Sequence, residues 1–135
     1  MSRRNPVTID QLGYLSRGRS RHRPRDSVHL YGGPYPFMQT GDVKHSGIYL
    51  NEYSQTYSEA GLEQSKIWPI GTLCITIAAN IAETSILGIE ACFPDSVIGF
   101  IPDSEKSDAR FIKYYFDFEL KSKYRNISMG AYKTT

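Results

Sequence analysis

Five arginines at alternate positions are the residues of this sequence best suited to a defined chemistry. They lie in the segment SRGRSRHRPR and are Arg17, Arg19, Arg21, Arg23 and Arg25. In an extended chain such residues lie roughly 6.6 Å apart on one side, similar to the separation of neighbouring phosphates along a nucleic-acid backbone. Guanidinium groups form paired hydrogen bonds with phosphate or guanine. The spacing therefore favours binding to a polyanion, with a solvated basic arm as the alternative.

The charges of the chain are unevenly distributed. Residues 1–25 contain seven arginines and one aspartate, whereas residues 26–135 contain nine basic and thirteen acidic residues. The first segment is therefore strongly positive and the larger one mildly negative. A basic segment at one end of an acidic body indicates an oriented contact with a polyanion.

A second possible chemistry is metal-dependent cleavage of phosphodiesters. Asp95, Asp103 and Glu105 lie close together in the sequence, with Lys106 next to them, and paired carboxylates can hold the metal ion that such a reaction needs. However, adjacent residues of an extended strand point to opposite faces, which separates Glu105 from Lys106. We therefore expect a solvated turn here and rank a nuclease last among the possible functions.

Metal and cofactor sites are not indicated by the remaining residues. His22, His29 and His45 are scattered among loop residues without the spacing of a metal site. The sequence also has no phosphate-binding loop, nucleophile elbow or glycine-rich cofactor motif. We expect no metal, no cofactor and no catalysis by this chain.

Cys74 and Cys92 bear on the cellular compartment. Each lies in an apolar stretch, and the first residues, MSRRNPVTID, do not resemble a signal peptide. No run reaches the roughly 18 apolar residues that cross a bilayer. We therefore expect buried free thiols in a cytoplasmic protein without membrane association.

The length of 135 residues fits one domain with its own core. We expect an α+β fold: a single compact domain with a small twisted, mostly antiparallel sheet and a C-terminal amphipathic helix. Residues 1–9 are predicted to form a flexible arm, residues 10–126 the domain, and residues 127–135 a tail.

The first half of the domain is predicted from short patterns. Apolar residues at Ile9, Leu12 and Leu15 indicate one or two helical turns. The turn-rich sequence HLYGGPYP is expected to precede a short strand at residues 37–40, and residues 48–57 are strand-like. Ser58 can cap a short helix.

The second half contains the clearest pattern. The segment TLCITIAA alternates large apolar with small side chains, which predicts a strand. TSILGIEAC and SVIGFIP are its expected neighbours in a meander. After Ser107 or Asp108 as a cap, a helix is expected to bury its aromatic residues, and Trp68 is expected in the core. The apolar positions assigned to the buried face of this helix are Phe111, Ile112, Tyr115, Phe118 and Leu120.

Several strings of the sequence resemble one protein family in the same order. These are LGYLSRGRSRHRPRD, YGGPYPFMQTGDV, YSEAGLEQSKIWPIGTLCITIAANIAETSILGIEACFPDSVIGF and FIKYYF. Together they are similar to the target recognition domain of specificity subunits in type I restriction-modification systems. The resemblance covers most of the chain, from Leu12 to Tyr124, and is more specific than any single motif within it.

The resemblance implies a non-catalytic reader of double-stranded DNA. In that family a subunit carries two such domains, each reading one half of a bipartite target, and long helices between them dock methyltransferase subunits. Those partners supply adenine methylation with S-adenosylmethionine, and a restriction subunit supplies cleavage. This chain has one such domain and ends where the spacer helix is expected, so it is expected to be a fragment, a truncated gene product or an isolated domain, and its assembly with the partners stays open.

The resemblance also places candidate DNA contacts. The five alternating arginines are assigned mainly to phosphates, with Arg19 the best candidate to reach a base edge. Gln39 has the right side chain to pair with adenine. Alternatively, Gln39 and Thr40 form structural hydrogen bonds that fix the turn. Lys44 and His45 are within reach of the DNA backbone. For the segment IAANIAET, one interpretation places Asn80 or Thr84 at the DNA. The other, which we favour, is a tight turn held by hydrogen bonds of the Asn80 side chain.

A protein- or RNA-interaction module with a basic arginine arm is the alternative function. Asp42 is expected to cap a turn rather than touch DNA. The residues assigned as candidate DNA contacts are Arg17, Arg19, Arg21, Arg23, Arg25, Gln39, Thr40, Lys44 and Asn80.

Overall fold

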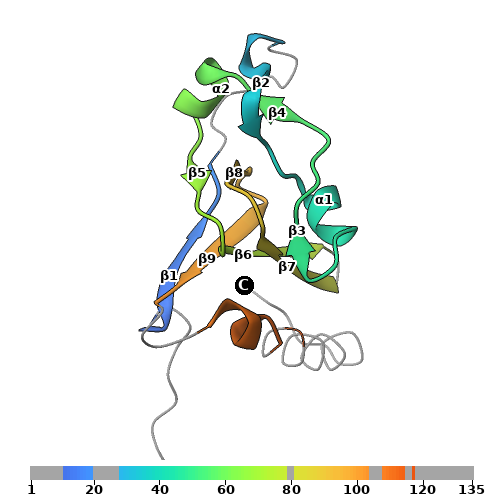
Figure 1. Cartoon of the computed structure of the whole chain (residues 1–135), viewed down its shortest axis with the longest axis vertical. Helices are drawn as coiled ribbons and strands as arrows, with labels where there is room; N and C mark the ends of the chain where they lie inside the picture. Colours follow the sequence, from blue (N-terminus) through green and yellow to red (C-terminus); the bar gives the residue numbers. More distant parts are fainter. Residues whose placement is uncertain (1–10, 20–27, 79–80, 104–107, 115–116, 118–135) are drawn as a thin grey trace, which may run out of the picture.

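The computed structural model describes residues 11–19, 28–78, 81–103, 108–114 and 117. Within these residues the strands form one five-stranded sheet and two sheets of two strands each (Figure 1). The five-stranded sheet has the order β1-β9-β6-β7-β3. Its strands are β1 (Gly13–Arg17), β9 (Val97–Pro102), β6 (Leu73–Ala78), β7 (Ile81–Leu87) and β3 (Tyr49–Leu50).

The pairing within this sheet is mostly antiparallel. β1 pairs with β9, β9 with β6, and β6 with β7 in antiparallel fashion, whereas β3 runs parallel to β7. The predicted α+β fold is therefore confirmed, as is the antiparallel pair β6–β7. The predicted meander is wrong, because β9 pairs with the other edge of β6 and leaves β6 in the centre. An order of pairing cannot be read from closeness in sequence when both neighbours are equally apolar.

The smaller sheets and helices lie on one side of the five-stranded sheet (Figure 1). β2 (Tyr31–Pro36) pairs with β4 (Thr56–Tyr57), and β5 (Ile67–Trp68) pairs with β8 (Ala91–Cys92). The helices on this side are η2 (Val28–Leu30), α1 (Thr40–Lys44) and α2 (Glu59–Glu63).

Ser58 caps α2, as predicted. Its side chain accepts a hydrogen bond from the Gly61 backbone N–H, which supplies a partner for one of the unpaired donors in the first turn.

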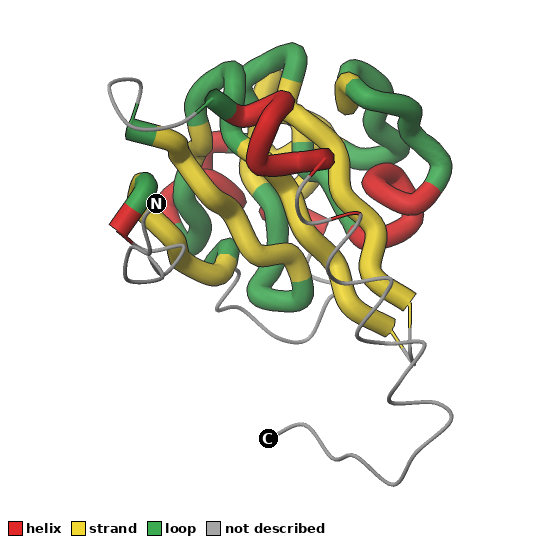
Figure 2. The backbone as a smooth tube through the Cα atoms, turned by 90° about the horizontal axis from the view of Figure 1, so that it is seen from below, coloured by secondary structure: helices red, strands yellow, loops and turns green. Residues whose placement is uncertain are grey.

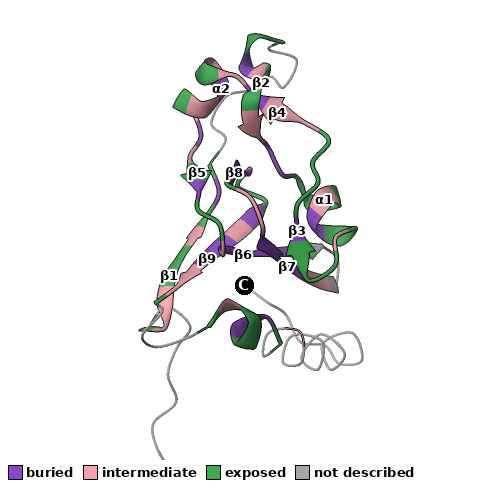
Figure 3. Ribbon diagram, in the orientation of Figure 1, coloured by how far each residue is buried: buried purple, intermediate pink, exposed green. Residues whose placement is uncertain are grey.

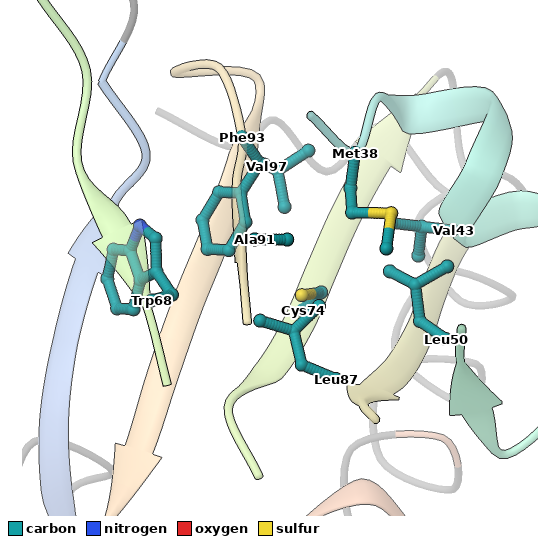
Figure 4. Packing of buried hydrophobic residues seen from close by; sticks show 9 residues of the cluster. All are labelled: Met38, Val43, Leu50, Trp68, Cys74, Leu87, Ala91, Phe93 and Val97. Atoms are coloured by element: carbon teal, nitrogen blue, oxygen red, sulfur yellow. The ribbon is translucent and has the colours of Figure 1, made fainter. Parts of the chain in front are cut away.

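Side chains from both faces of the five-stranded sheet are buried. On one face Cys74 and Leu87 pack with residues of α1, β5 and β8 (Figure 4). Trp68 is fully buried there and stacks on Phe93, with 4.8 Å between the ring centroids. The core position predicted for Trp68 is confirmed. On the other face the buried residues are Leu73, Ile75, Ile86, Phe100 and Ile112.

Two predictions for the first half of the chain are wrong. Leu15 lies in β1 and not in a helix, because that segment pairs with β9 along its whole length. Residues 37–40 make one bridge, between Phe37 and Cys92, and then enter α1. The carboxylate of Asp42 accepts a hydrogen bond from the Gln39 N–H at 2.8 Å, which stabilises the start of a helix where a strand end was expected.

The segment 48–57 also departs from its pattern. It contributes two residues to β3 and two to β4, and these strands belong to different sheets. An alternating pattern of this length does not reveal where the chain leaves one sheet for another.

The C-terminal helix packs across the second face of the five-stranded sheet (Figure 2). Asp108 caps it by accepting hydrogen bonds from the backbone N–H groups of Arg110 and Phe111. Helical residues are described at 109–114 and 117. Ile112 is buried as expected, but Phe111 is 66% exposed and Tyr114 53% exposed. The prediction that the Phe and Tyr side chains of this helix belong to the core is thus wrong for these two.

Lys113 takes part in the buried surface that the aromatic residues were expected to form. Its ammonium lies 2.9 Å from Asp117 Oδ2 and donates to Thr84 Oγ1 at 3.0 Å. The neighbours Tyr115, Phe118 and Leu120 lie outside the described residues. In the described part of the chain, no helix is long and apolar enough to span a membrane.

Candidate nucleic-acid interface

Arg17 and Arg19 lie where the edge strand β1 ends. Arg17 is exposed, and its Nη1 donates to the backbone carbonyl of Asp95 at 3.1 Å. The Arg19 backbone N–H donates to the Phe93 carbonyl at 3.1 Å. The structure therefore brings these two predicted residues together at one end of β1, where both are fastened to backbone carbonyls of neighbouring segments.

The side chain of Arg19 is held most firmly. Its Nε and Nη2 both donate to the carbonyl oxygen of Ser65, at 3.3 and 2.8 Å, and Ser65 Oγ donates to the carbonyl of Arg19. Two of its guanidinium nitrogens are thus engaged within the protein. Base reading by Arg19 stays a prediction, in which the guanidinium edge not bound to Ser65 would face the DNA.

Gly18 allows this close approach. The residue is buried, and a Cβ at this position would lie 2.4 Å from the carbonyl oxygens of both Phe93 and Pro94. Contacts below 3.0 Å do not occur for real Cβ atoms, so only glycine lets β1 pass the 93–94 backbone at this distance.

Two further residues join this site that the sequence did not single out. The ammonium of Lys66 donates to the hydroxyl of Tyr14 at 3.0 Å and lies 4.4 Å from the centroid of that ring. It also lies 4.2 Å from the centroid of the Trp68 ring. A signal was present in SKIWP, since alternate residues of an extended segment share a face and place Lys66 beside Trp68.

The surroundings of Tyr14 lower the pKa of its phenol from the ordinary value. The hydrogen bond from Lys66 is the largest cause of a lowered Tyr14 pKa, followed by a hydrogen bond from Ser16 and the charge of Lys66. The charge of Arg19 acts in the same direction. Lys66 and Arg19, which lies two residues after the end of β1, thus act on the same phenol.

The cations of this site have no carboxylate partner among the described residues. Arg17 and Arg19 are bound to neutral carbonyls, and Lys66 to a phenol and two ring faces. In the ranges that the structure describes, the only ion pair joins Lys113 to Asp117, away from this site. We name the group formed by Tyr14, Arg17, Arg19 and Lys66 the basic edge.

Gln39 and Thr40 lie elsewhere, at the start of α1. With His45 they line an open cavity of about 700 Å³, which Asn51, Glu52 and Ser54 border from the following loop. His45 is exposed, and its Nδ1 lies 2.9 Å from the Gly41 carbonyl. Lys44 is the exposed last residue of α1. The amides and hydroxyls of this cavity are groups that can bind base edges.

The cavity and the basic edge are far apart on the domain. Tyr49 and Leu50 of β3 line the cavity, and β3 and β1 are the two opposite edges of the five-stranded sheet. Four strand spacings separate these edges, which amounts to roughly 19 Å. Figure 3 shows both edge strands carrying exposed residues, whereas the strands between them are largely buried. The other predicted contacts, Arg21, Arg23, Arg25 and Asn80, lie outside the described residues.

The residues considered for a metal-dependent nuclease or another metal site are not brought together in the described part of the chain. Asp95 and Asp103 are exposed, and the described residues contain no group of three or more His, Cys, Asp or Glu side chains that could hold a metal ion. His29 is exposed like His45, whereas His22, Glu105 and Lys106 lie outside the described ranges. The expected free, buried state of both thiols is confirmed for Cys74 and Cys92.

The fold of this chain is similar to part of two solved structures. The chain matches the "Crystal structure of HsdS subunit from Thermoanaerobacter tengcongensis" with a TM-score of 0.64 and 15% identity, over 86% of this chain and 27% of that one. It also matches a structure reported as "Structural basis underlying complex assembly and conformational transition of the type I R-M system", with a TM-score of 0.65 and 18% identity, over 83% of this chain and 26% of that one. The chain thus spans about a quarter of the length of each, and shares its fold with that part.

The family is shown by the sequence itself. The family model described as "Type I restriction modification DNA specificity domain" matches residues 4–134. The chain therefore belongs to this family, and the resemblance inferred from its strings is confirmed. Domains of this family are in general non-catalytic.

Proposed function

We propose that this chain binds double-stranded DNA in a sequence-specific manner and reads one half of a bipartite target for a type I restriction-modification complex. In this function the chain catalyses nothing and needs no cofactor of its own. Methyltransferase subunits that use S-adenosylmethionine, together with a restriction subunit, would act on the sites that it selects.

The observation that carries this proposal is the charge of Arg17 and Arg19, with which no carboxylate in the described part of the chain forms an ion pair. Both guanidinium groups are held by backbone carbonyls at the end of an edge strand, immediately before the remaining alternating arginines. A fixed cation without a carboxylate partner attracts a polyanion strongly and loses little side-chain freedom when it binds. Each phosphate contact adds about 0.9 to the dependence of log affinity on log salt.

Sequence reading is assigned to groups that reach base edges. Gln39 and Thr40 border the cavity beside α1, with Lys44 at the end of the same helix. We assign base contacts to Gln39 and Thr40 and a phosphate contact to Lys44. The contacts proposed outside the described residues are Arg21, Arg23, Arg25 and Asn80.

Fluorescence anisotropy with the full chain tests this function. A random duplex, a single strand and an RNA of equal length are titrated across a salt series, and a library of duplexes then reports sequence preference. We expect preferential binding to duplex DNA, a steep salt dependence and an enriched half-site motif. Indifference to duplex DNA at low salt would contradict the proposal, and preference for RNA would support an RNA-interaction module instead.

A further inference from the structure

The basic edge contains a built site around Lys66 that goes beyond the arginine contacts. We propose that Lys66, Tyr14 and Arg19 together bind one phosphodiester group of the DNA backbone. This inference rests on the proposed DNA-binding function and adds Lys66 and Tyr14, to which neither the arginine pattern nor the family resemblance assigned a DNA contact.

The position of Lys66 is fixed before any ligand arrives. Its ammonium lies 4.2 Å from the Trp68 centroid and 4.4 Å from the Tyr14 centroid, and it donates to Tyr14 Oη at 3.0 Å. Trp68 itself is fully buried and stacked on Phe93, so the surface under Lys66 is rigid. A lysine that is already ordered avoids much of the side-chain entropy that a phosphate contact normally costs.

The partners of Lys66 attract its charge without neutralising it. Aromatic faces and a phenol oxygen carry no net charge, and an ammonium group has three donors of which Tyr14 takes one. Tyr14 is half exposed as a residue, and its hydroxyl can turn its own hydrogen towards an anion. Two donors of different kinds therefore meet at the same point of the surface.

Arg19 extends this site into the arginine segment. It is fixed to Ser65, the residue next to Lys66, and its charge acts on the Tyr14 phenol. The two cations of the site, Arg19 and Lys66, thus come from segments that are remote in the sequence. A polyanion with regularly spaced charges can contact this site and Arg17 at once, which favours a nucleic-acid backbone over an isolated anion.

The experiment compares three variants of the full chain in duplex DNA binding across a salt series. Lys66→Met keeps an aliphatic side chain over the rings and removes the charge, whereas Tyr14→Phe keeps the ring and removes the hydroxyl. Arg110→Met, in the C-terminal helix on the other face of the sheet, removes one exposed positive charge as a matched control. Circular dichroism and urea unfolding verify that each variant is folded.

We expect Lys66→Met to lower the salt slope by about 0.9 and to weaken binding about tenfold. Tyr14→Phe is expected to weaken binding about threefold with an unchanged slope, because a neutral donor is lost. Arg110→Met is expected to match the wild-type slope. If Lys66→Met changes only the urea midpoint, or changes binding no more than Arg110→Met, Lys66 merely fastens β1 and the inference is overturned.

Two further results separate this inference from the proposed function. A wild-type chain that binds duplex DNA while Lys66→Met keeps its slope overturns the phosphate site alone. A wild-type chain that ignores duplex DNA at low salt overturns both. Competition with polyglutamate distinguishes the phosphodiester from other polyanions: displacement as effective as that by random duplex would contradict the assignment.

Discussion

Arg19 and Ser65 hydrogen-bond each other reciprocally, each from its side chain to the backbone carbonyl of the other. Arg19 Nε and Nη2 donate to the Ser65 carbonyl, and Ser65 Oγ donates to the Arg19 carbonyl. These bonds connect residues 46 positions apart and join the exit of β1 to the chain that enters β5. The same side chain therefore stabilises the fold and presents a charge at the surface.

This double role predicts different results for two substitutions of Arg19. Arg19→Ala is expected to reduce the free energy of unfolding by about 1 kcal/mol through the lost hydrogen bonds. It should also lower the salt slope of duplex binding by about 0.9. Arg19→Lys keeps the charge, so we expect a similar loss of stability with the slope preserved. Urea unfolding and anisotropy check both, and equal slopes for the two variants would remove Arg19 from the DNA contact.

Tyr14 is expected to ionise at lower pH than an ordinary tyrosine, because the hydrogen bond from Lys66 lowers its pKa. The difference in tyrosinate absorbance between wild type and Tyr14→Phe isolates this one phenol during an alkaline titration. Lys66→Met should shift the difference signal back to higher pH. Ionised Tyr14 pairs with Lys66 and offsets its charge, so duplex affinity should begin to fall at lower pH in wild type than in Tyr14→Phe. Coincident titrations of wild type and Lys66→Met would contradict this origin of the shift.

The sequence was sufficient to predict features of the fold that depend on local pattern. The strand at β6 followed from its alternation, the cap of α2 from Ser58, and the buried Trp68 from its size and surroundings. Features that depend on distant pairing were not predictable. The position of β9 beside β6 and the strand conformation of Leu15 both result from long-range hydrogen bonds that leave no local signal.

The candidate site was predictable to a similar extent. Arg17 and Arg19 were singled out by their spacing, and their DNA contacts stay predictions. The hydrogen bonds that hold them depend on carbonyls of Asp95 and Ser65 that are remote in sequence. The proposed role of Lys66 was not predicted because it requires β1 to lie beside β5, which places the Tyr14 ring centroid 6.0 Å from that of Trp68. The separation of the arginines from Gln39 likewise emerges only from the strand order.

Both cysteines are expected to be unreactive in the folded protein. Burial raises the pKa of the Cys74 thiol strongly and that of Cys92 to about 11. Their thiolate fraction near neutral pH is therefore very small. A chromogenic thiol reagent should label the native chain slowly and label two thiols rapidly after unfolding in urea.

The same shift gives a sign for the pH dependence of stability. Unfolded thiols ionise near their ordinary pKa of about 8.5, whereas the folded thiols stay protonated. The folded state then binds more protons, so the free energy of unfolding should decrease as the pH rises above that value. The double variant Cys74→Ala with Cys92→Ala removes this pH dependence and serves as its control. In the labelling experiment, rapid reaction of the native protein would contradict the burial of the thiols.

The network of Lys113, Asp117 and Thr84 is expected to hold the C-terminal helix on the sheet. Lys113 is buried, its ammonium lies 2.9 Å from Asp117 Oδ2, and Thr84 Oγ1 donates to Asp117 Oδ1 at 2.6 Å.

Asp117→Ala leaves the Lys113 ammonium without its counter-charge and should lower the free energy of unfolding by about 2 kcal/mol. This loss is smaller than for a fully enclosed pair, because Asp117 is partly exposed. The double variant Asp117→Ala with Lys113→Met removes both charges and should recover part of that loss. Urea unfolding measures both, and a single variant as stable as wild type would show that the pair is screened by solvent. Duplex binding by folded Asp117→Ala should match wild type, since this network lies on the face of the sheet opposite the basic edge.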